Sequence, residues 1–193
     1  MMIGKNILLR KTENADLQNF RSWFIDRTYI KALSGSLSQQ ALEEKLNLIL
    51  EENSKLYGSE QYFLIEDKKN EALGFLLFSF IHWRNKNLSL EIFLKPEKQN
   101  KFYGMEAIIL GLLYAFSHLN MHKVSMFINE FNENALGIAQ KTAVLEGKLG
   151  KQAFYDGRYW DVLVFGILKD EFEKQKEKAV RLGYGYVATN QYF

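Results

Sequence analysis

The chain has 193 residues, of which 47% are hydrophobic and 25% charged, enough apolar side chain to build one substantial core. It contains no cysteine, which excludes a disulfide framework and a cysteine-ligated metal site. The net charge is +2 and the lysines and arginines are spread along the chain, whereas a nucleic-acid binder typically concentrates them in a basic stripe.

The first residues, Met1 to Asn6, lack the apolar core of a signal peptide. No apolar stretch approaches the ~20 residues that a membrane span needs. We therefore expect a cytoplasmic protein that binds neither a membrane nor nucleic acid.

In chain order, the first elements are one strand and two helices. The run from Asn6 to Lys11 is typical of a strand, and Thr12 to Asn14 offers polar caps for a helix at about residues 15–26. Ser38 can cap a second helix, whose apolar residues recur at helical spacing. These residues are Leu42, Leu46, Ile49 and Leu50.

Three aromatic and β-branched runs follow, at 61–66, 72–83 and 87–94, and the polar turns between them predict an antiparallel meander. Pro96 ends the third run. An apolar helix is then expected at about 103–119, a strand at 122–129 and a short helix at 134–141.

Two late strands, at about 149–155 and 159–168, can pair through the turn dipeptide Asp156-Gly157. A charged helix is expected at 169–181, and the tail at 183–193 has no clear period. The order of elements predicts a single α/β (α+β) domain over residues 1–193, with a mixed, mostly antiparallel sheet flanked by helices.

The most informative segment runs from Leu88 to Ala107, where a strand ends, a polar loop follows and a helix begins. Such a loop can direct several backbone N–H groups at one anion, and Lys98 and Lys101 add positive charge. Glycine-containing turns of this kind are also common without a ligand, so these residues alone leave both interpretations open.

The segment resembles the acetyl-CoA-binding motif of the GNAT acetyltransferases, which leads from Gln or Arg through glycines into a helix that opens with Glu-Ala. The matching residues are Gln99, Gly104, Glu106 and Ala107. Four further runs are similar to the Rim-type and polyamine-type branches of that family and keep their order over roughly residues 7–168. They are Tyr114–Phe116 with the residues up to Val124, Asn132 with Ala135, Glu146-Gly147, and Tyr155–Asp161.

This resemblance implies an N-acetyltransferase that uses acetyl-CoA as co-substrate, needs no metal, and acetylates a primary amine by direct attack. The acceptor is expected to be a small amine, an amino-sugar or a protein N-terminus, and a homodimer is compatible with it. The alternative is a GNAT-fold binding or regulatory protein with lost or weakened catalysis. It is motivated by Phe102, which replaces the first glycine of the phosphate loop, and by Ala139, which replaces the tyrosine that many relatives use to protonate the CoA thiolate.

The resemblance also implies a set of cofactor-binding residues, and an oxyanion-binding N–H near the first two of them. The set is Phe93, Leu94, Gln99, Asn100, Lys101, Phe102, Tyr103, Gly104, Met105 and Asn132. Asn132 is equally suited to be a helix N-cap, and the two roles are compatible.

Attack by an amine needs a group that takes its proton. Glu91 is the leading candidate, because it lies on the same strand face as Ser89, the position where many relatives carry a carboxylate. An ordinary strand glutamate is the alternative. His82 is the second candidate, against a structural histidine, and Trp83, Tyr155 and Trp160 are candidates for the acceptor pocket. Asp161 is suited to a cationic acceptor or to a structural role.

Overall fold

The computed structural model describes residues 1–26, 39–99, 101–174 and 187–188. The strands are β1 (Met2–Ile3), β2 (Ile7–Lys11), β3 (Gln61–Asp67), β4 (Ala72–His82), β5 (Asn87–Leu94), β6 (Lys123–Asn129), β7 (Val144–Tyr155), β8 (Arg158–Leu168) and β9 (Val187–Ala188). The α-helices are α1 (Leu17–Phe24), α3 (Gln39–Ser54), α4 (Lys101–Leu113) and α5 (Glu133–Thr142), and residues 169–174 are also helical. Short helical turns are η1 (Asn14–Asp16), η2 (Pro96–Lys98) and the π-helical η3 (Tyr114–His118).

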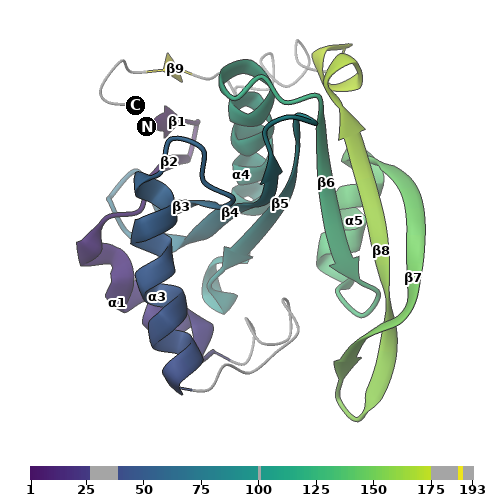
Figure 1. Cartoon of the computed structure of the whole chain (residues 1–193), viewed down its shortest axis with the longest axis horizontal. Coiled ribbons are helices and arrows are strands. Elements are labelled where there is room, and N and C mark those ends of the chain that lie inside the picture. The colour runs from purple at the N-terminus through teal and green to yellow at the C-terminus, as the bar shows by residue number, and fades with distance from the viewer. Residues whose placement is uncertain (27–38, 100, 175–186, 189–193) are drawn as a thin grey trace.

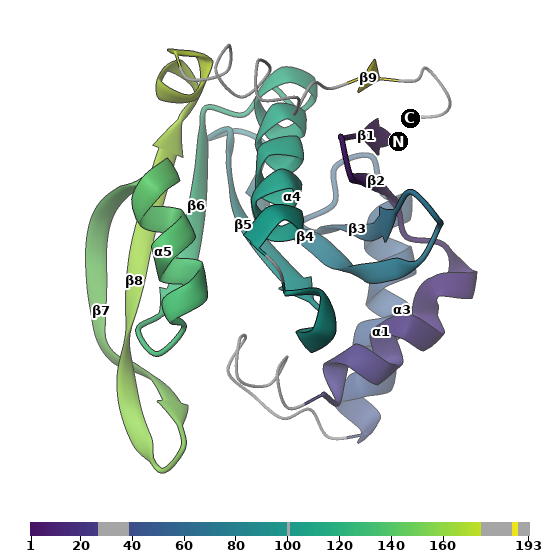
Figure 2. The same cartoon turned by 180° about the vertical axis from the view of Figure 1, so that it is seen from behind.

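Within the described residues, the nine strands form one sheet in the order β7-β8-β6-β5-β4-β3-β2-β1-β9. Neighbouring strands are antiparallel except for β5 and β6, which are parallel. Helices α1 and α3 lie on one face of the sheet, and α4 and α5 lie on the other (Figures 1 and 2). The predicted α/β class with a mixed, mostly antiparallel sheet is therefore confirmed. None of the helices in the described part of the chain is long and apolar enough to cross a membrane.

Three elements differ from the sequence-based expectation. Strands β1 and β9 were not predicted, because two residues are too few to show an alternating pattern. Strand β7 begins at Val144 and not at the expected 149. Its first residues were missed from the sequence because most side chains of this strand are exposed and its alternation is interrupted. The expected helix at 103–119 is α4 followed by η3, where the Leu119 N–H donates to the Tyr114 carbonyl five residues back. The end of the helix expected at 169–181 lies outside the described residues.

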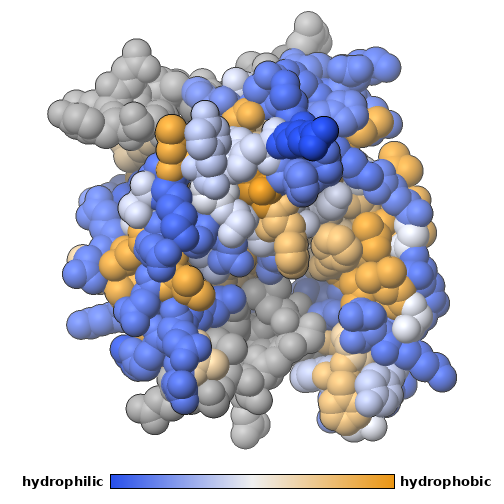
Figure 3. All heavy atoms as spheres, in the orientation of Figure 1, coloured by the Kyte–Doolittle hydropathy of each residue, from blue (hydrophilic) through white to orange (hydrophobic). Residues whose placement is uncertain are grey.

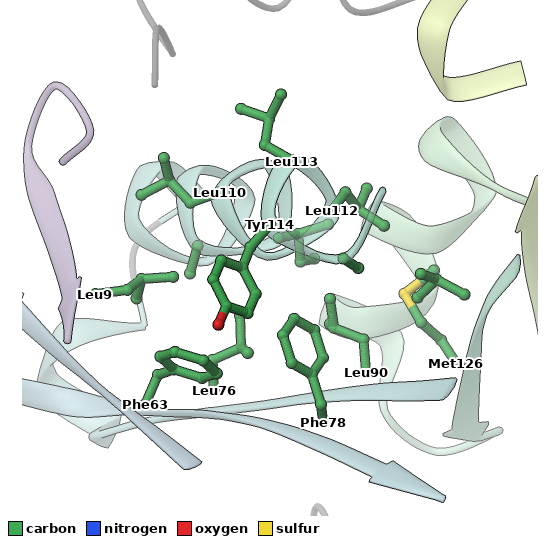
Figure 4. Packing of buried hydrophobic residues seen from close by; sticks show 14 of the residues in the cluster. Leu9, Phe63, Leu76, Phe78, Leu90, Leu110, Leu112, Leu113, Tyr114 and Met126 are labelled. Atoms are coloured by element: carbon green, nitrogen blue, oxygen red, sulfur yellow. The ribbon is translucent and has the colours of Figure 1, made fainter. Parts of the chain in front are cut away.

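The larger core lies between the sheet and α4. The Tyr114 ring stacks on Phe78 with centroids 6.1 Å apart and meets Phe63 edge-on at 5.2 Å (Figure 4). The buried Glu106 carboxylate anchors α4 to the start of β2, since it accepts hydrogen bonds from the Asn6 backbone N–H at 2.8 Å and from the Asn6 side-chain amide at 2.9 Å. This anchoring fixes α4 against the strands.

The second core lies between the sheet and helices α1 and α3. Phe20 and Trp23 of α1 stack on Phe75 of β4, and Trp23 also contacts Phe93 of β5. Strand β5 therefore contributes Phe93 to one core and Leu88, Leu90 and Leu94 to the other. Packing on both faces holds the strand rigidly.

The outer strand β7 is irregular. Its pairing with β8 shifts register between Leu145 and Gly147 and again between Leu149 and Ala153. The carboxylate of Asp161 accepts the backbone N–H of Lys151 at 2.7 Å and forms an ion pair with Lys148, so Asp161 has the structural role. Asp156 and Gly157 both have positive φ, 53° and 75°, as a two-residue hairpin turn of the predicted kind requires.

Candidate active site

The parallel strands β5 and β6 pair over only three residues, from Asn87 with Lys123 to Ser89 with Ser125, and then diverge (Figure 1). A cavity of about 470 Å³ lies where they separate. Its lining from β5 and β6 is Leu90, Glu91, Ile92, Phe93, Leu94, Met126, Phe127, Ile128 and Asn129. Gln99 and the first turns of α4, together with α5 and the residues before it, complete the wall.

The β5 residues that line this cavity belong to both faces of the sheet. Successive residues of a strand point to opposite faces. Ile92 packs against the core under α4, whereas Phe93 packs against the core under α1 and α3, and both line the cavity.

The hydrogen-bond ladder determines which peptide groups face this opening. The Lys95 N–H donates to the Leu73 carbonyl at 2.9 Å, and the register from there to Ser89 is uniform. In an antiparallel pair, hydrogen-bonded residues alternate along the strand. Phe93 therefore directs its N–H toward β4, while Ile92 and Leu94 direct theirs toward the gap. Of the two expected oxyanion donors, the ladder favours Leu94 over Phe93.

Glu91 lies in the cavity wall on the α1/α3 side of the sheet, since it shares a strand face with Phe93. The Ser79 hydroxyl donates a hydrogen bond to its carboxylate at 2.7 Å. Burial raises the pKa of Glu91 above its ordinary value of 4.5, while the Ser79 hydrogen bond and Lys45 act in the opposite direction. A carboxyl group with a raised pKa beside a cavity is suited to proton transfer.

The opposite end of the cavity lies at the start of α4, where Gly104 and Met105 line it. A Cβ built on Gly104 would have no neighbour closer than the Leu94 Cδ1 atom at 3.7 Å, so internal packing does not require a glycine here. The Gln99 side chain donates to the Leu94 carbonyl at 3.0 Å and also lines the cavity. A ligand can thus approach the α4 backbone closely.

Phe102 does not line the cavity, and 67% of its side chain is exposed. Its φ is not positive, so its N–H keeps the ordinary direction of a first helical turn. Tyr103 packs against the core instead of the cavity. Lys98 is held by Glu71, with its Nζ 2.7 Å from a carboxylate oxygen. Asn100 and the Lys101 side chain, both expected to bind the cofactor, lie outside the described residues.

Asn132 is the N-cap of α5 and also lies where a cofactor-binding residue is expected. Its side-chain oxygen accepts the Ala135 N–H at 3.2 Å as the N-cap of α5, and the residue also lines the cavity. Ala139 lines the same wall and is 1% exposed.

The second candidate base and the aromatic candidates lie elsewhere. His82 pairs with Asn87, about 14 Å along β5 from Glu91, and does not line the cavity. The Trp83 indole N–H donates to the Gly58 carbonyl at 3.0 Å near that same end. Tyr155 and Trp160 pack around Phe131, just beyond the end of β6. None of these four residues is brought together with Glu91.

Several cavity residues were not singled out from the sequence, notably Phe127, Asn129 and Gly137. The alternation of β6 places Phe127 and Asn129 on the face opposite to the core residues Met126 and Ile128. That pattern is visible in the sequence. Its meaning depends on the separation of β6 from β5, which only the fold reveals.

Comparisons with known proteins agree with this geometry. A family model described as "Acetyltransferase (GNAT) domain" matches residues 6–143. A curated relative, spermidine N(1)-acetyltransferase of Vibrio cholerae, is 26% identical over 91% of this chain and 100% of its own length. The uncharacterized N-acetyltransferase YokL of Bacillus subtilis, derived from prophage SPbeta, is 25% identical over 88% of this chain and 94% of its own. The crystal structure of the V. cholerae spermidine N-acetyltransferase in complex with CoA and spermine superposes with a TM-score of 0.78 at 26% identity, covering 86% of this chain and 98% of that one.

Proposed function

Since this chain belongs to the acetyltransferase (GNAT) family, we propose that it transfers the acetyl group of acetyl-CoA to a primary amine by direct attack. One observation carries the proposal: the cavity lies where β5 and β6 separate, and both Glu91 of β5 and the start of α4 line it. In this proposal the acceptor approaches from the α1/α3 face, on which Glu91 lies, and acetyl-CoA approaches from the α4 face. Each substrate then has its own entrance, and no covalent enzyme intermediate is needed.

The residues around the cavity fit the thioester substrate. The peptide groups of Ile92 and Leu94 face the gap, where they can pair with the amides of a pantetheine arm. Gly104 leaves the α4 backbone accessible, and the helix N-terminus favours a phosphate group. Asn132 supplies a further polar side chain on the facing wall.

The proposed reaction begins when the neutral amine nitrogen attacks the thioester carbonyl carbon. The Leu94 N–H stabilises the negative charge that develops on the carbonyl oxygen. Glu91 takes the proton that the nitrogen loses, directly or through a water molecule. The C–S bond then breaks, the acetyl group stays on nitrogen, and the thiolate of CoA leaves and takes up a proton.

The names of the relatives place alkyl amines first among the acceptors to test. The V. cholerae relative is named a spermidine N(1)-acetyltransferase, so spermidine is the reference acceptor. Amino-sugars and protein N-termini are the remaining primary amines in the proposal.

The alternative is a binding or regulatory protein on the same fold. It is favoured by Ala139, which puts no acid where many relatives carry a tyrosine. The structure offers less support for a loss of cofactor binding through Phe102, because that side chain lies outside the cavity.

Two measurements test the proposal. Titration calorimetry with acetyl-CoA measures cofactor binding, and a thiol assay follows CoA release with a panel of primary amines. Binding together with amine-dependent CoA release is the expected result. Binding without release with any amine would favour the regulatory alternative. No binding at millimolar acetyl-CoA would rule out the enzyme and leave the binding or regulatory alternative.

A further inference from the structure

A second hollow, of about 350 Å³, adjoins the cavity on the α1/α3 side of the sheet. Its lining is Phe80, Asn87, Leu88, Ser89, Lys123, Ser125 and Phe127. Phe127 borders the hollow and the cavity alike, and Ser89 lies about 7 Å along β5 from Glu91 on the same face. The hollow thus begins beside the candidate base.

The hollow exists because small residues follow one another across the sheet. Ser79 pairs with Ser89, Ser89 with Ser125, and Ser125 with Gly166. Of these residues, Ser89 and Ser125 line the hollow and form its floor. On this face of the molecule, Figure 3 shows hydrophobic side chains gathered over β6, β8 and β7.

Phe80 forms one wall in an unfavourable conformation. It belongs to a bulge in β4, where Phe80 and Ile81 together oppose Leu88, and it has a φ of 49°. A positive φ is costly for a bulky residue, and 76% of the Phe80 side chain is exposed as well. The sheet gains no core contact from this ring. Strain of this kind is retained most often at functional sites.

The charges around the hollow do not suit a second ammonium group. None of the described residues that line it carries a carboxylate, and the one charged side chain among them is that of Lys123. Lys123 is paired with Glu146 at 2.6 Å, which leaves that end of the hollow without net charge. The Phe80 and Phe127 rings in this lining are suited to contact an uncharged alkyl or aryl group.

We propose that this hollow binds an uncharged, apolar substituent of the acceptor, so that the enzyme prefers monoamines with an alkyl or aryl group to polycationic amines. This inference rests on the proposed function, because the hollow is read as a continuation of the acceptor side of the same site. Phe80 and Phe127 are then the residues that determine specificity.

The test compares two amines with the same six-carbon chain, hexylamine and hexamethylenediamine, of which only the second carries an ammonium group at its far end. At saturating acetyl-CoA, kcat/KM for hexylamine is expected to exceed that for the diamine by about tenfold, since none of the described lining residues offers a carboxylate to the second ammonium group, which loses hydration on entering the hollow. Spermidine serves as the polycationic reference.

Three variants sharpen the comparison. Phe80→Ala is expected to raise KM for hexylamine about tenfold with little change in KM for acetyl-CoA, because it removes one apolar wall. Ser125→Asp places a carboxylate on the floor and is expected to shift the preference toward the diamine. Phe154→Ala, at an exposed phenylalanine outside both cavities, is the matched control. It should change neither KM for hexylamine nor the preference between hexylamine and the diamine. Melting curves establish that each variant is folded.

A higher kcat/KM for spermidine or the diamine than for hexylamine, unaffected by Phe80→Ala, would overturn this inference and leave the proposed function intact. If no amine supports CoA release, the proposed function fails, and calorimetry then tests whether the hollow binds an apolar group. Hexylamine must then bind the CoA complex at least about tenfold more tightly in the wild type than in Phe80→Ala. Equal binding would overturn the inference by this route as well.

Discussion

Ser79 and Glu91 lie diagonally across β4 and β5, and the Ser79 hydroxyl donates a hydrogen bond of 2.7 Å to the Glu91 carboxylate. This bond stabilises the charged form of a carboxyl group whose pKa burial raises. The two effects oppose each other, and the raised pKa of Glu91 reflects the larger contribution of burial.

Ser79→Ala tests the proton-transfer role of Glu91. Without the hydroxyl, the charged carboxylate loses a stabilising donor, so the pKa of Glu91 should rise further. When kcat/KM is calculated from the concentration of neutral amine and plotted against pH, its acid limb should therefore move to higher pH. Glu91→Gln should remove this limb and lower kcat/KM by about a hundredfold or more. An unchanged profile in Glu91→Gln would show that another group takes the proton.

The Glu91 carboxylate should lower the free energy of unfolding at neutral pH. Because its folded-state pKa is raised, Glu91 favours folding below its ordinary value of 4.5, and this contribution is lost as the pH rises through the raised pKa. Glu91→Gln should therefore melt at a higher temperature than the wild type near pH 8, with the difference vanishing below about pH 4. Glu44→Gln, which removes an exposed carboxylate of α3, is the matched control.

Gly104 and Gly111 of α4 should respond in opposite ways to alanine. A Cβ on Gly104 meets nothing closer than 3.7 Å, and alanine is the better helix former by roughly 0.5–1 kcal/mol, so Gly104→Ala should melt at or above the wild-type temperature. It should also weaken acetyl-CoA binding, because the added methyl group faces the cavity. In Gly111→Ala the Cβ would lie 2.6 Å from the Leu76 Cδ1 atom, so stability should fall while the folded fraction keeps its affinity. Calorimetry and melting curves distinguish the two, and equal affinity in both variants would contradict a cofactor site at Gly104.

Ala139→Tyr should restore an acid for the departing thiolate. Ala139 is buried in the cavity wall at the position where many relatives carry a tyrosine. Ala139→Phe adds nearly the same bulk without the hydroxyl and is the matched control. The kcat of the tyrosine variant should exceed that of the phenylalanine variant by about tenfold or more. Equal values would mean that thiolate protonation does not limit the rate.

Arg10 should contribute to the stability of the fold but not to catalysis. Its guanidinium contacts Asp16 at 2.7 Å and Glu66 at 2.8 Å, and both carboxylates are largely buried. Arg10→Met should destabilise the fold by about 3–5 kcal/mol, because it leaves two largely buried carboxylates without their cationic partner. Burial opposes ionisation of Asp16, but the hydrogen bonds from Arg10 and the Glu13 N–H outweigh it and lower its pKa. Wild-type stability should accordingly decline as the pH falls through that lowered pKa, and less so in Arg10→Met. Denaturant titrations across pH measure both effects.

The elements that could be predicted from sequence are those with strong local signals. Strand β5 has the expected bounds because an alternating run is closed by Lys95-Pro96, and the Asp156-Gly157 turn follows from residues that tolerate positive φ. The position of Glu91 on the Ser89 face follows from the same alternation. These inferences need only neighbours in sequence.

The rest of the site depends on contacts between distant segments. The opening between β5 and β6 arises because their pairing stops at Ser89 and Ser125, and nothing local marks that point. The exposure of Phe80 depends on a bulge against Leu88. His82 and Trp83 were chosen for their chemistry, but the strand carries them to the far end of β5 from the cavity.

The broken register of β7 has a consequence for how copies of this protein can associate. A sheet grows by edge-to-edge addition only if its outer strand presents a regular row of backbone donors and acceptors. Two features interrupt that row in β7: its two register shifts, and the hydrogen bond that the Lys151 N–H donates to the Asp161 carboxylate. This rim of the sheet should therefore resist aggregation by strand addition, and any assembly formed along it must rely on side chains such as Leu149 and Phe154.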